Sequence, residues 1–434
     1  MHQQATPEEA AESGKHDSAD RIRCYSRYLL FILFLVGLLN FIDRQILLIL
    51  IEPIRRDLGL SDTQIGLLTG FAFAIVYATG GLAIARIADS TSRRLVLGIA
   101  ILVWSGMTTL GSLAQTFWHL ALARLGVAAG EAAATPSAHG LIAEHFPEHR
   151  RALAISIFSL ATPCGTMLGF AGGGWLAGHF HWRTVFLMVG LPGLLLGIVQ
   201  LLTVRDNGVS KHRNEIQSMR THAIGTLLRR PSFVHVVIAF TFVAIAGYGF
   251  AAFQAPFFIR LYGFTSAEAG LAIGLLYGIS GGAGTLVGGI LADSLGKRDP
   301  RWRLWLPALG MMISAVLMGL ALTASDGRTS AWLMVVPQFS GMLYLAPCYG
   351  VAQTLASPAS RSMASAIILC AAGLIGGGFG PLMVGAVSDA LSSNYGSDAL
   401  RYACLLIVPT QLLAAWFLYA GGRALPADMK KPLA

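Results

Sequence analysis

The chain has 434 residues, of which 55% are hydrophobic and only 12% are charged. Soluble domains carry about 25% charged residues, so this composition excludes an ordinary water-soluble protein. A membrane-spanning helix takes about 20 apolar residues, and a dozen such helices with short connections account for nearly the whole length. The chain therefore has no room for a large soluble domain.

The charge balance is basic, with 31 Lys and Arg against 22 Asp and Glu. Such an excess can serve nucleic-acid binding, or it can lie in the cytoplasmic loops of a membrane protein. With the N-terminus placed in the cytoplasm, 22 of the 31 basic residues fall in inside segments and six in outside loops. This bias predicts that both termini are cytoplasmic and that nucleic acid is not a partner. The chain also lacks an Asn-x-Ser/Thr sequon, which is consistent with a bacterial inner membrane.

Twelve apolar runs follow one another along the chain, and we expect each to cross the membrane once. The polar stretch before the first run lacks the features of a signal peptide. The expected organisation is a cytoplasmic tail, a bundle of six helices, a cytoplasmic linker, a second bundle of six helices and a cytoplasmic tail, at residues 1–27, 28–204, 205–231, 232–421 and 422–434. The runs lie near residues 28–51, 64–87, 95–114, 117–142, 152–175, 183–204, 232–259, 266–291, 303–324, 330–356, 362–388 and 401–421.

The motifs of enzymes and ATP-driven pumps are missing from the sequence. It has no Walker loop, dinucleotide-binding fingerprint or His-Glu-x-x-His motif. Its five cysteines are odd in number and widely spaced, so they predict neither a disulfide framework nor a metal site. We therefore expect a protein that is not an enzyme and that has no cofactor and no metal.

An internal repeat relates the two halves of the chain. Gly59-Leu-Ser-Asp-Thr-Gln-Ile-Gly66 aligns with Gly263-Phe-Thr-Ser-Ala-Glu-Ala-Gly270 at a shift of 204 residues, and Gly165 aligns with Gly376 at a shift of 211. Two parallel repeats of six helices are the architecture of transporters in which a substrate site lies between two rocking halves. The sequence thus predicts an all-α membrane protein of two pseudo-symmetric six-helix bundles.

Two sets of residues resemble known transporter signatures. Gly289-Ile-Leu-Ala-Asp293-Ser-Leu-Gly-Lys-Arg298 is similar to the motif between helices 2 and 3 of the major facilitator superfamily, and the copy from Ala85 to Arg94 is degenerate. Asn40-Phe-Ile-Asp43-Arg44 and Arg124-Leu-Gly-Val-Ala-Ala-Gly130-Glu131 resemble the spinster family within it. The resemblance implies the major facilitator fold with 12 transmembrane helices. It also implies proton-coupled export of lipids such as lysophospholipids or sphingosine phosphate.

Four ionisable residues lie inside the first and fourth expected helices, namely Asp43, Arg44, Arg124 and Glu131. A charge at the centre of a membrane helix costs roughly 2.5 to 3.5 kcal/mol, so this set needs a reason. At about 1.5 Å per residue, Asp43 and Arg124 lie at similar depth, and Glu131 lies nearly two turns from Arg124 on the same face. We expect the four side chains to form a ladder between the two helices.

This set can couple protons to an anionic substrate. An arginine neighbour favours the charged form of a carboxylate, whereas desolvation favours the neutral form, and alternating access can switch which effect prevails. We assign proton coupling to Asp43 and Glu131, and binding of an anionic headgroup to Arg44 and Arg124, because guanidinium groups suit phosphate and carboxylate. The alternative interpretation is a buried network that only joins the two helices.

The second half offers aromatic and amide side chains in place of charges. Tyr248, Phe253, Gln254 and Tyr344 are candidates for substrate contact, although each could equally serve packing. A cavity that is charged on one wall and aromatic on the other suits an amphipathic molecule. At the cytoplasmic helix ends, a second group of four residues is expected to hold a gate closed across the two halves, by ion pairs and helix-end contacts: Asp89, Arg94, Asp293 and Arg298.

These observations predict a proton-coupled exporter of an amphipathic anionic lipid, acting as a monomer among membrane lipids. An alternative keeps the mechanism and takes a small organic anion or drug as substrate. A third hypothesis is a membrane receptor or scaffold without transport, in which the buried charges are only structural.

Overall fold

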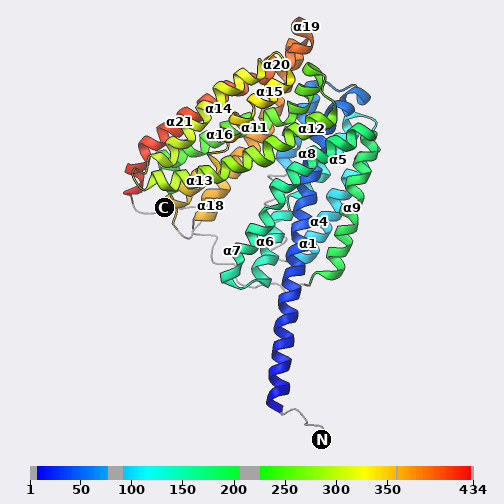
Figure 1. Ribbon diagram of the computed structural model, residues 1–434, viewed down its shortest axis with the longest axis vertical. Helices are drawn as coiled ribbons and strands as arrows, with labels where there is room; N and C mark the ends of the chain where they lie inside the picture. Colours follow the sequence, from blue (N-terminus) through cyan, green and yellow to red (C-terminus); the bar gives the residue numbers. More distant parts are fainter. Residues whose placement is uncertain (1–6, 77–90, 206–224, 358–359, 432–434) are drawn as a thin grey trace.

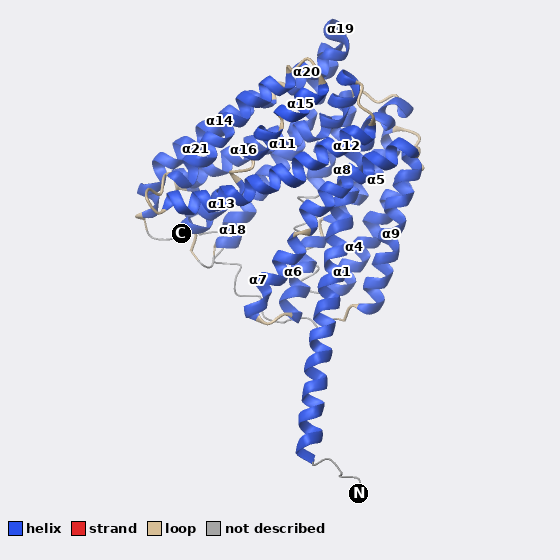
Figure 2. Ribbon diagram, in the orientation of Figure 1, coloured by secondary structure: helices blue, strands red, loops and turns tan. Residues whose placement is uncertain are grey.

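The computed structural model describes residues 7–76, 91–205, 225–357 and 360–431. All regular elements in these ranges are helices, and none of the residues in them forms a strand (Figure 2). The helices group into two bundles, one formed by the N-terminal half of the chain and one by the C-terminal half (Figure 1). The expected all-α membrane architecture is therefore confirmed.

The first bundle contains the helices before residue 205. Two of the expected crossings are each built from two helices, because short breaks at 132–133 and 160 interrupt them. Its elements are α1 (Pro7–Leu58), α2 (Asp62–Gly66), the π-helix η1 (Leu67–Phe71), α4 (Arg93–Gly111), α5 (Phe117–Glu131), α6 (Ala134–His145), α7 (Glu148–Ser159), α8 (Ala161–His179) and α9 (Trp182–Thr203).

The second bundle repeats this pattern with more interruptions. Its elements are α11 (Pro231–Tyr262), α12 (Ser266–Leu275), the π-helix η2 (Leu276–Gly281), α13 (Gly282–Gly296), α14 (Trp302–Leu322), α15 (Gly327–Leu333), α16 (Val335–Gly341), α17 (Leu345–Leu355), α18 (Arg361–Ala371), the π-helix η3 (Ala372–Gly376), α19 (Gly377–Tyr395), the 3₁₀-helix η4 (Gly396–Asp398), α20 (Ala399–Cys404) and α21 (Ile407–Met429).

Nine helical stretches among the described residues are long and apolar enough to cross a membrane. One of them, Met363–Met429, contains two expected crossings. The shorter apolar helix Asp62–Val76 belongs to the expected second crossing, whose remainder lies outside the described residues, and α5 with α6 covers the fourth. The arrangement is thus consistent with twelve crossings.

The internal repeat is visible in the local geometry of two equivalent turns. Gly59 and Gly263 both have positive φ angles, of 63° and 69°, a conformation that glycine adopts without steric cost. Two residues later, Ser61 and Thr265 each cap the following helix in a capping box with Gln64 or Glu268. The same sequence pattern therefore starts the second crossing of each bundle in the same way.

The two bundles touch at the end opposite the chain termini. There α8 packs on α12, α19 packs on α2 and η1, and α1 packs on α11. Glycines make these contacts close: a Cβ added to Gly174 would lie 2.4 Å from the carbonyl oxygen of Ser266, and one added to Gly66 would lie 2.4 Å from that of Pro381. Toward the termini the bundles diverge (Figure 1). The molecule is closed at the outer end, meaning the end away from the termini, and open at the other.

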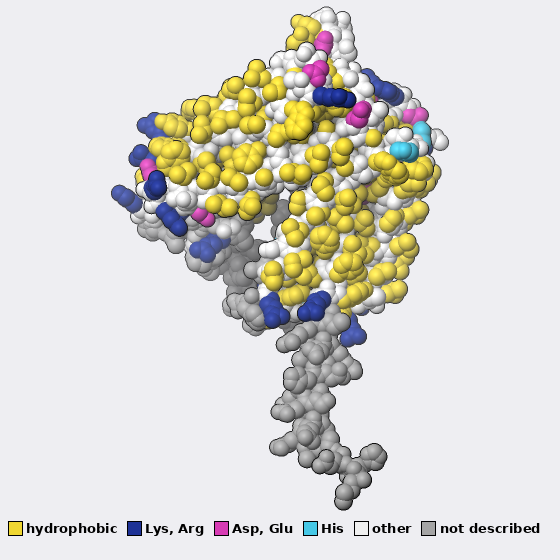
Figure 3. Space-filling model, in the orientation of Figure 1, with side chains coloured by type: hydrophobic (Ala, Val, Ile, Leu, Met, Phe, Trp, Pro, Cys, Tyr) yellow, Lys and Arg dark blue, Asp and Glu magenta, His cyan; other side chains and the backbone are white. Residues whose placement is uncertain are grey.

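Apolar side chains cover the flanks of both bundles, while Lys and Arg gather near the ends (Figure 3). Many of these apolar side chains are exposed, for example Trp118, Leu202, Leu286 and Trp332 at 71%, 76%, 66% and 78%. Such a surface is the expected one for a protein that lies in lipid. The chain is therefore a multi-pass membrane protein.

Candidate transport site

Arg44 and Glu131 form the direct ion pair between α1 and α5. Nε of Arg44 donates to Oε2 of Glu131 at 3.2 Å, and Nη2 donates to the same oxygen at 2.5 Å. The Glu131 side chain is fully buried, whereas that of Arg44 keeps 24% of its surface exposed. The pair thus has one face toward open space and one face in the bundle.

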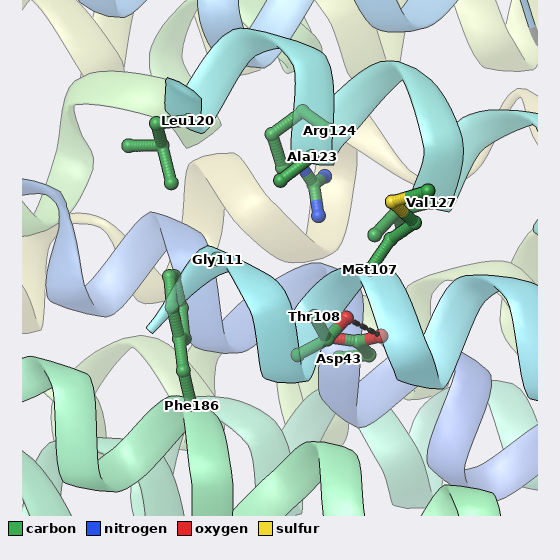
Figure 4. Close-up of a pocket in the computed structure, with 9 residues that line it drawn as sticks. All are labelled: Asp43, Met107, Thr108, Gly111, Leu120, Ala123, Arg124, Val127 and Phe186. Carbon is green, nitrogen blue, oxygen red and sulfur yellow. Dashed lines mark hydrogen bonds between the residues drawn. The ribbon is translucent and has the colours of Figure 1, made fainter. Parts of the chain in front are cut away.

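Asp43 makes a different contact, because adjacent residues on a helix point about 100° apart. Its Oδ2 accepts a hydrogen bond from Oγ1 of Thr108, on α4, at 2.6 Å (Figure 4). Both residues are 5% exposed. Thr108 was not singled out by the sequence, although a hydroxyl within the apolar run 95–114 is a signal that could have found it.

Arg124 is the cation of this group that has no acidic partner at salt-bridge distance among the described residues. It is 7% exposed, and its Nε donates no hydrogen bond within the described part of the chain. It points from α5 toward Asp43 across a small cavity (Figure 4). The cavity is otherwise lined by Met107, Thr108, Gly111, Leu120, Ala123, Val127 and Phe186. A buried guanidinium with a free donor beside a cavity can bind an anion.

An aromatic ring joins the two arginines. The guanidinium carbon of Arg44 lies 5.0 Å from the centre of the Phe73 ring, and that of Arg124 lies 5.2 Å from it. Cations within about 6 Å of an aromatic ring are attracted by its quadrupole. Phe73 follows the π-helix η1 and places this ring between the two cations. The sequence did not predict a role for this residue.

The structure brings the four predicted residues together in one bundle, within electrostatic range of one another. We call Asp43, Arg44, Arg124 and Glu131 the inner set. Their formal charges sum to zero, but their hydrogen bonds do not close the group, because Arg124 Nε and Glu131 Oε1 are buried without described partners. Buried polar atoms of this kind are normally satisfied, so the inner set retains capacity for a proton, water or ligand.

The four candidates in the second bundle lie in different surroundings. Tyr248 on α11 is 48% exposed, whereas Phe253 and Gln254 on the same helix are 0% and 2% exposed and pack inside the bundle. Tyr344 is 9% exposed, and its ring contacts that of Phe240 edge to face at 4.9 Å. In this conformation only Tyr248 offers a large accessible surface.

The three expected gate residues that the structure describes do not meet across the open end. Asp89 lies outside the described residues. Arg94 donates to the carbonyl oxygen of Leu201 on α9, which is a contact within its own bundle. The side chains of Asp293 and Arg298 are exposed and form no ion pair with a described residue. A gate built from these residues would have to form in a conformation closed on this side.

A second group of charges closes the outer end, and the sequence analysis did not predict it. Arg260 on α11 reaches across to the first bundle, where Nε donates to Oε2 of Glu52 at 2.6 Å and Nη1 donates to both carboxylate oxygens of Asp62 at 2.8 Å. Arg56 donates to the other oxygen of Glu52 at 3.1 Å, and Ser388 donates to Asp62 at 2.7 Å. We call these five residues the outer cluster.

Asp389 reinforces this closure. Its carboxylate accepts hydrogen bonds from the backbone N–H groups of Asp62 and Thr63, at 3.0 and 2.7 Å, and from the Thr63 hydroxyl at 2.6 Å. A carboxylate at a helix N-terminus is favoured by the helix dipole and by the free N–H groups. The end of α19 thereby caps the start of α2 across the two bundles.

Comparison with known proteins agrees with this architecture. The family model of the Major Facilitator Superfamily matches residues 33–381. The chain belongs to the major facilitator superfamily. Its members are transporters, so the chain is a transporter and not an enzyme.

Relatives within the superfamily include transporters of the spinster family. A bacterial homologue of the human lysosomal transporter Spinster, solved in an inward-facing and unoccupied conformation, has 29% sequence identity and a TM-score of 0.87, over 94% of this chain and 99% of that one. Protein spinster homolog 1 of Xenopus tropicalis is 26% identical over 94% of this chain and 82% of its own length. The resemblance to the spinster family is confirmed.

A bacterial relative has a higher identity. The MFS-type efflux pump of Mycolicibacterium smegmatis is 37% identical over 89% of this chain and 90% of its own length. The chain is thus related both to spinster proteins and to an efflux pump.

Proposed function

We propose that this transporter exports an amphipathic anionic lipid, of the lysophospholipid or sphingosine phosphate kind, and that this transport is coupled to protons. The observation that carries the proposal is Arg124, a buried cation with a free donor that faces a small cavity and Asp43. An anionic headgroup supplies the acceptor that Arg124 lacks. The exposed Tyr248 and the apolar surroundings in the second bundle suit an acyl chain.

Proton coupling follows from the pairing of Arg44 with Glu131. When Glu131 takes a proton, the cation of Arg44 is no longer neutralised and can join Arg124 in holding the headgroup. When the proton leaves, the ion pair forms again and the headgroup loses one of its two cations. Asp43 plays the same part toward Arg124, with Thr108 orienting its carboxylate. The carboxylate and the headgroup compete for the same arginines, so protonation of the carboxylate and binding of the headgroup favour each other, which couples proton and substrate.

The open end lies on the side of both chain termini. We place the protein in a bacterial inner membrane with both termini in the cytoplasm. In this orientation the described conformation faces inward. The outer cluster and Asp389 hold the outside closed, and the gate of Asp89, Arg94, Asp293 and Arg298 forms when the protein faces outward. We keep the division into bundles at 28–204 and 232–421, joined by a linker at 205–231, as the two rocking units of a monomer.

A second candidate substrate is a small organic anion or drug, which the similarity to an efflux pump favours. The inner set would bind the acidic group of either substrate. The two candidates differ in what the second bundle must accommodate, because only the lipid carries a long acyl chain.

The test is transport into inside-out proteoliposomes under an imposed pH gradient. We expect uptake of radiolabelled lysophosphatidylglycerol that is driven by an acidic bath, which is the cytoplasmic side of these vesicles, and is abolished by a protonophore. A hydrophilic dicarboxylate such as glucarate serves as the comparison. Gradient-driven uptake of glucarate without uptake of the lysolipid would favour the second candidate, and uptake that ignores the gradient would contradict proton coupling.

A further inference from the structure

The two carboxylate oxygens of Glu131 are in different situations. Oε2 accepts both hydrogen bonds from Arg44, whereas Oε1 is buried and has no hydrogen-bond partner among the described residues. A proton taken up by Glu131 therefore belongs on Oε1, where it does not displace the arginine. Because Glu131 is 1% exposed, this proton needs a route to solution.

Several further polar atoms in the same bundle are buried without a described partner, and two of them precede or follow the Arg44–Glu131 pair within a few residues. They are Nδ2 of Asn40, a residue that is 8% exposed, and Oγ of Ser137, which belongs to a residue that is 1% exposed. Neither side chain lines the cavity at Arg124 or takes part in an ion pair. The contacts of the inner set give no reason for a polar residue at either position. An apolar residue there would avoid the cost of burying an unsatisfied polar atom.

The helix register places both atoms on one side of the Arg44–Glu131 pair. Asn40 precedes Arg44 by one turn and lies on the same face of α1, about 6 Å nearer the chain termini. Ser137 follows Glu131 by six residues on a chain that runs the other way, which brings it about 9 Å toward the same side. The two helices pack against each other, and Val36 of α1 and Ala138 of α6 belong to one buried cluster.

Buried polar atoms that lack a protein partner are usually hydrogen-bonded to internal water, which makes about three hydrogen bonds. We propose that Asn40 and Ser137 hold a chain of internal waters through which Glu131 exchanges its proton with the solution on the side of the termini. This inference rests on the proposed proton coupling and adds the route. It gives a role to the asparagine of the Asn40-Phe-Ile-Asp43-Arg44 motif.

In this proton transfer only O–H bonds break and form. The proton passes from Oε1 of Glu131 to the first water, each water hands on one proton, and the glutamate remains as a carboxylate on Arg44. Ser137 can donate and accept, so it can join the relay, whereas Asn40 orients a water by donation. The other charged groups around Glu131 are Arg44, Asp43 and Arg124. His139 on α6 packs against the Phe158 ring at 5.6 Å, so that contact holds it on the α7 side.

The route can be timed without a transport substrate. In the purified full-length protein, the carbonyl stretch of protonated Glu131 is followed by time-resolved infrared spectroscopy after a jump to higher pH, and the band is assigned by its loss in Glu131→Gln. We expect the band to decay at least tenfold more slowly in the double variant Asn40→Leu with Ser137→Ala. Asn40→Ser keeps a hydrogen-bond donor at the site and is expected to stay within about threefold of the wild type.

Ser112→Ala is the matched control. Ser112 is also a buried serine, at 2% exposure, but it lies on the outer side of the inner set and donates to the Thr109 carbonyl oxygen at 2.6 Å. Its removal should leave the decay unchanged. A decay within twofold of the wild type in the double variant, or in Ser137→Ala alone should the double variant not fold, overturns the route. If the wild type shows no Glu131 carbonyl band that changes with pH, Glu131 is not protonated, and the proposed coupling is contradicted as well.

Discussion

Two groups of charged side chains share α1 at different depths, and their carboxylates are hydrogen-bonded in opposite ways. In the outer cluster every carboxylate oxygen of Glu52 and Asp62 accepts a hydrogen bond, and Arg260 joins the two bundles. The inner set lies within one bundle and leaves Oε1 of Glu131 and Nε of Arg124 without described partners.

The difference separates closure of the outer end from coupling between proton and substrate. A carboxylate whose oxygens all accept hydrogen bonds stabilises one conformation and has no free oxygen for a proton, whereas the free oxygen of Glu131 can take a proton and the free Nε of Arg124 can bind an anion. Nη2 of Arg260 is also buried without a described partner, but Arg260 already pairs with two carboxylates. We therefore propose that the outer cluster holds the outer end closed and that the inner set binds protons and substrate. The predictions below test this division, from the largest expected effect to the smallest.

Removing the cation of the outer cluster should open the outer end. Arg260→Gln removes the cation that joins Glu52 and Asp62 to the second bundle and leaves them Arg55 of their own bundle, at 3.7 and 3.5 Å. Breaking a buried pair costs up to about 3 to 5 kcal/mol. We expect spin labels at Leu113 and Ser393, in a background without native cysteines, to move apart in double electron–electron resonance. The control is Arg183→Gln, because Arg183 pairs with Asp57 inside the first bundle. Equal distances in Arg260→Gln and wild type would contradict the assignment.

Removing the free cation of the inner set should abolish substrate binding and leave the outer end closed. The loss of a charge-assisted hydrogen bond is worth up to about 3 kcal/mol, which corresponds to about 100-fold in affinity. We expect this loss for lysophosphatidylglycerol uptake in Arg124→Gln, and partial activity in Arg124→Lys. Unchanged spin-label distances will separate this effect from that of Arg260→Gln. Uptake within threefold of the wild type in Arg124→Gln would refute the anion site.

Close backbone contact at the outer end gives a prediction of intermediate size. A Cβ on Gly174 would meet Ser266 O at 2.4 Å, whereas one on Gly172 would meet nothing within 4 Å. Overpacking costs about 1 to 3 kcal/mol, so Gly174→Ala should shift the population toward the outward-open state and Gly172→Ala should not. The same spin-label pair measures both variants. Identical distance distributions for the two would show that glycine packing does not contribute to closure.

The smallest effect is expected at Thr108. Thr108→Val removes the hydrogen bond to Asp43, which is worth about 1 kcal/mol, and should lower proton-driven uptake a few-fold. Thr109→Val is the control, because the Thr109 hydroxyl donates to the backbone oxygen of Ser105 and not to the inner set. Equal uptake in the two valine variants would remove Thr108 from the site.

The sequence predicted the helical fold and the members of the inner set because each is a local signal. Apolar runs define the helices, and an ionisable residue inside such a run is conspicuous. Depth alone paired Asp43 with Arg124, but the direct ion pair is Arg44 with Glu131, since depth along a helix does not determine the direction in which a side chain points.

The outer cluster escaped prediction for a different reason. Arg260 lies 198 residues from Asp62 and 208 from Glu52, and by sequence it counts as a charge of an outside loop. Pairing between bundles depends on how the two repeats pack, which is a tertiary property that spacing does not encode. Phe73 was missed because an aromatic residue in an apolar run carries no polar signal.

Glu131 is proposed to carry a transported proton, whereas the equally buried Glu52 only holds the outer end closed. Proton movement during lysophosphatidylglycerol transport, recorded with a pH-sensitive dye inside proteoliposomes, tests it directly. We expect Glu131→Gln to retain exchange of labelled for unlabelled lysolipid but to move fewer protons per lipid than the wild type, because only Asp43 can still carry one. It also predicts that Glu52→Gln changes the rate but keeps the wild-type ratio of protons to lipid. The same ratio of protons to lipid in Glu131→Gln as in the wild type would contradict the account.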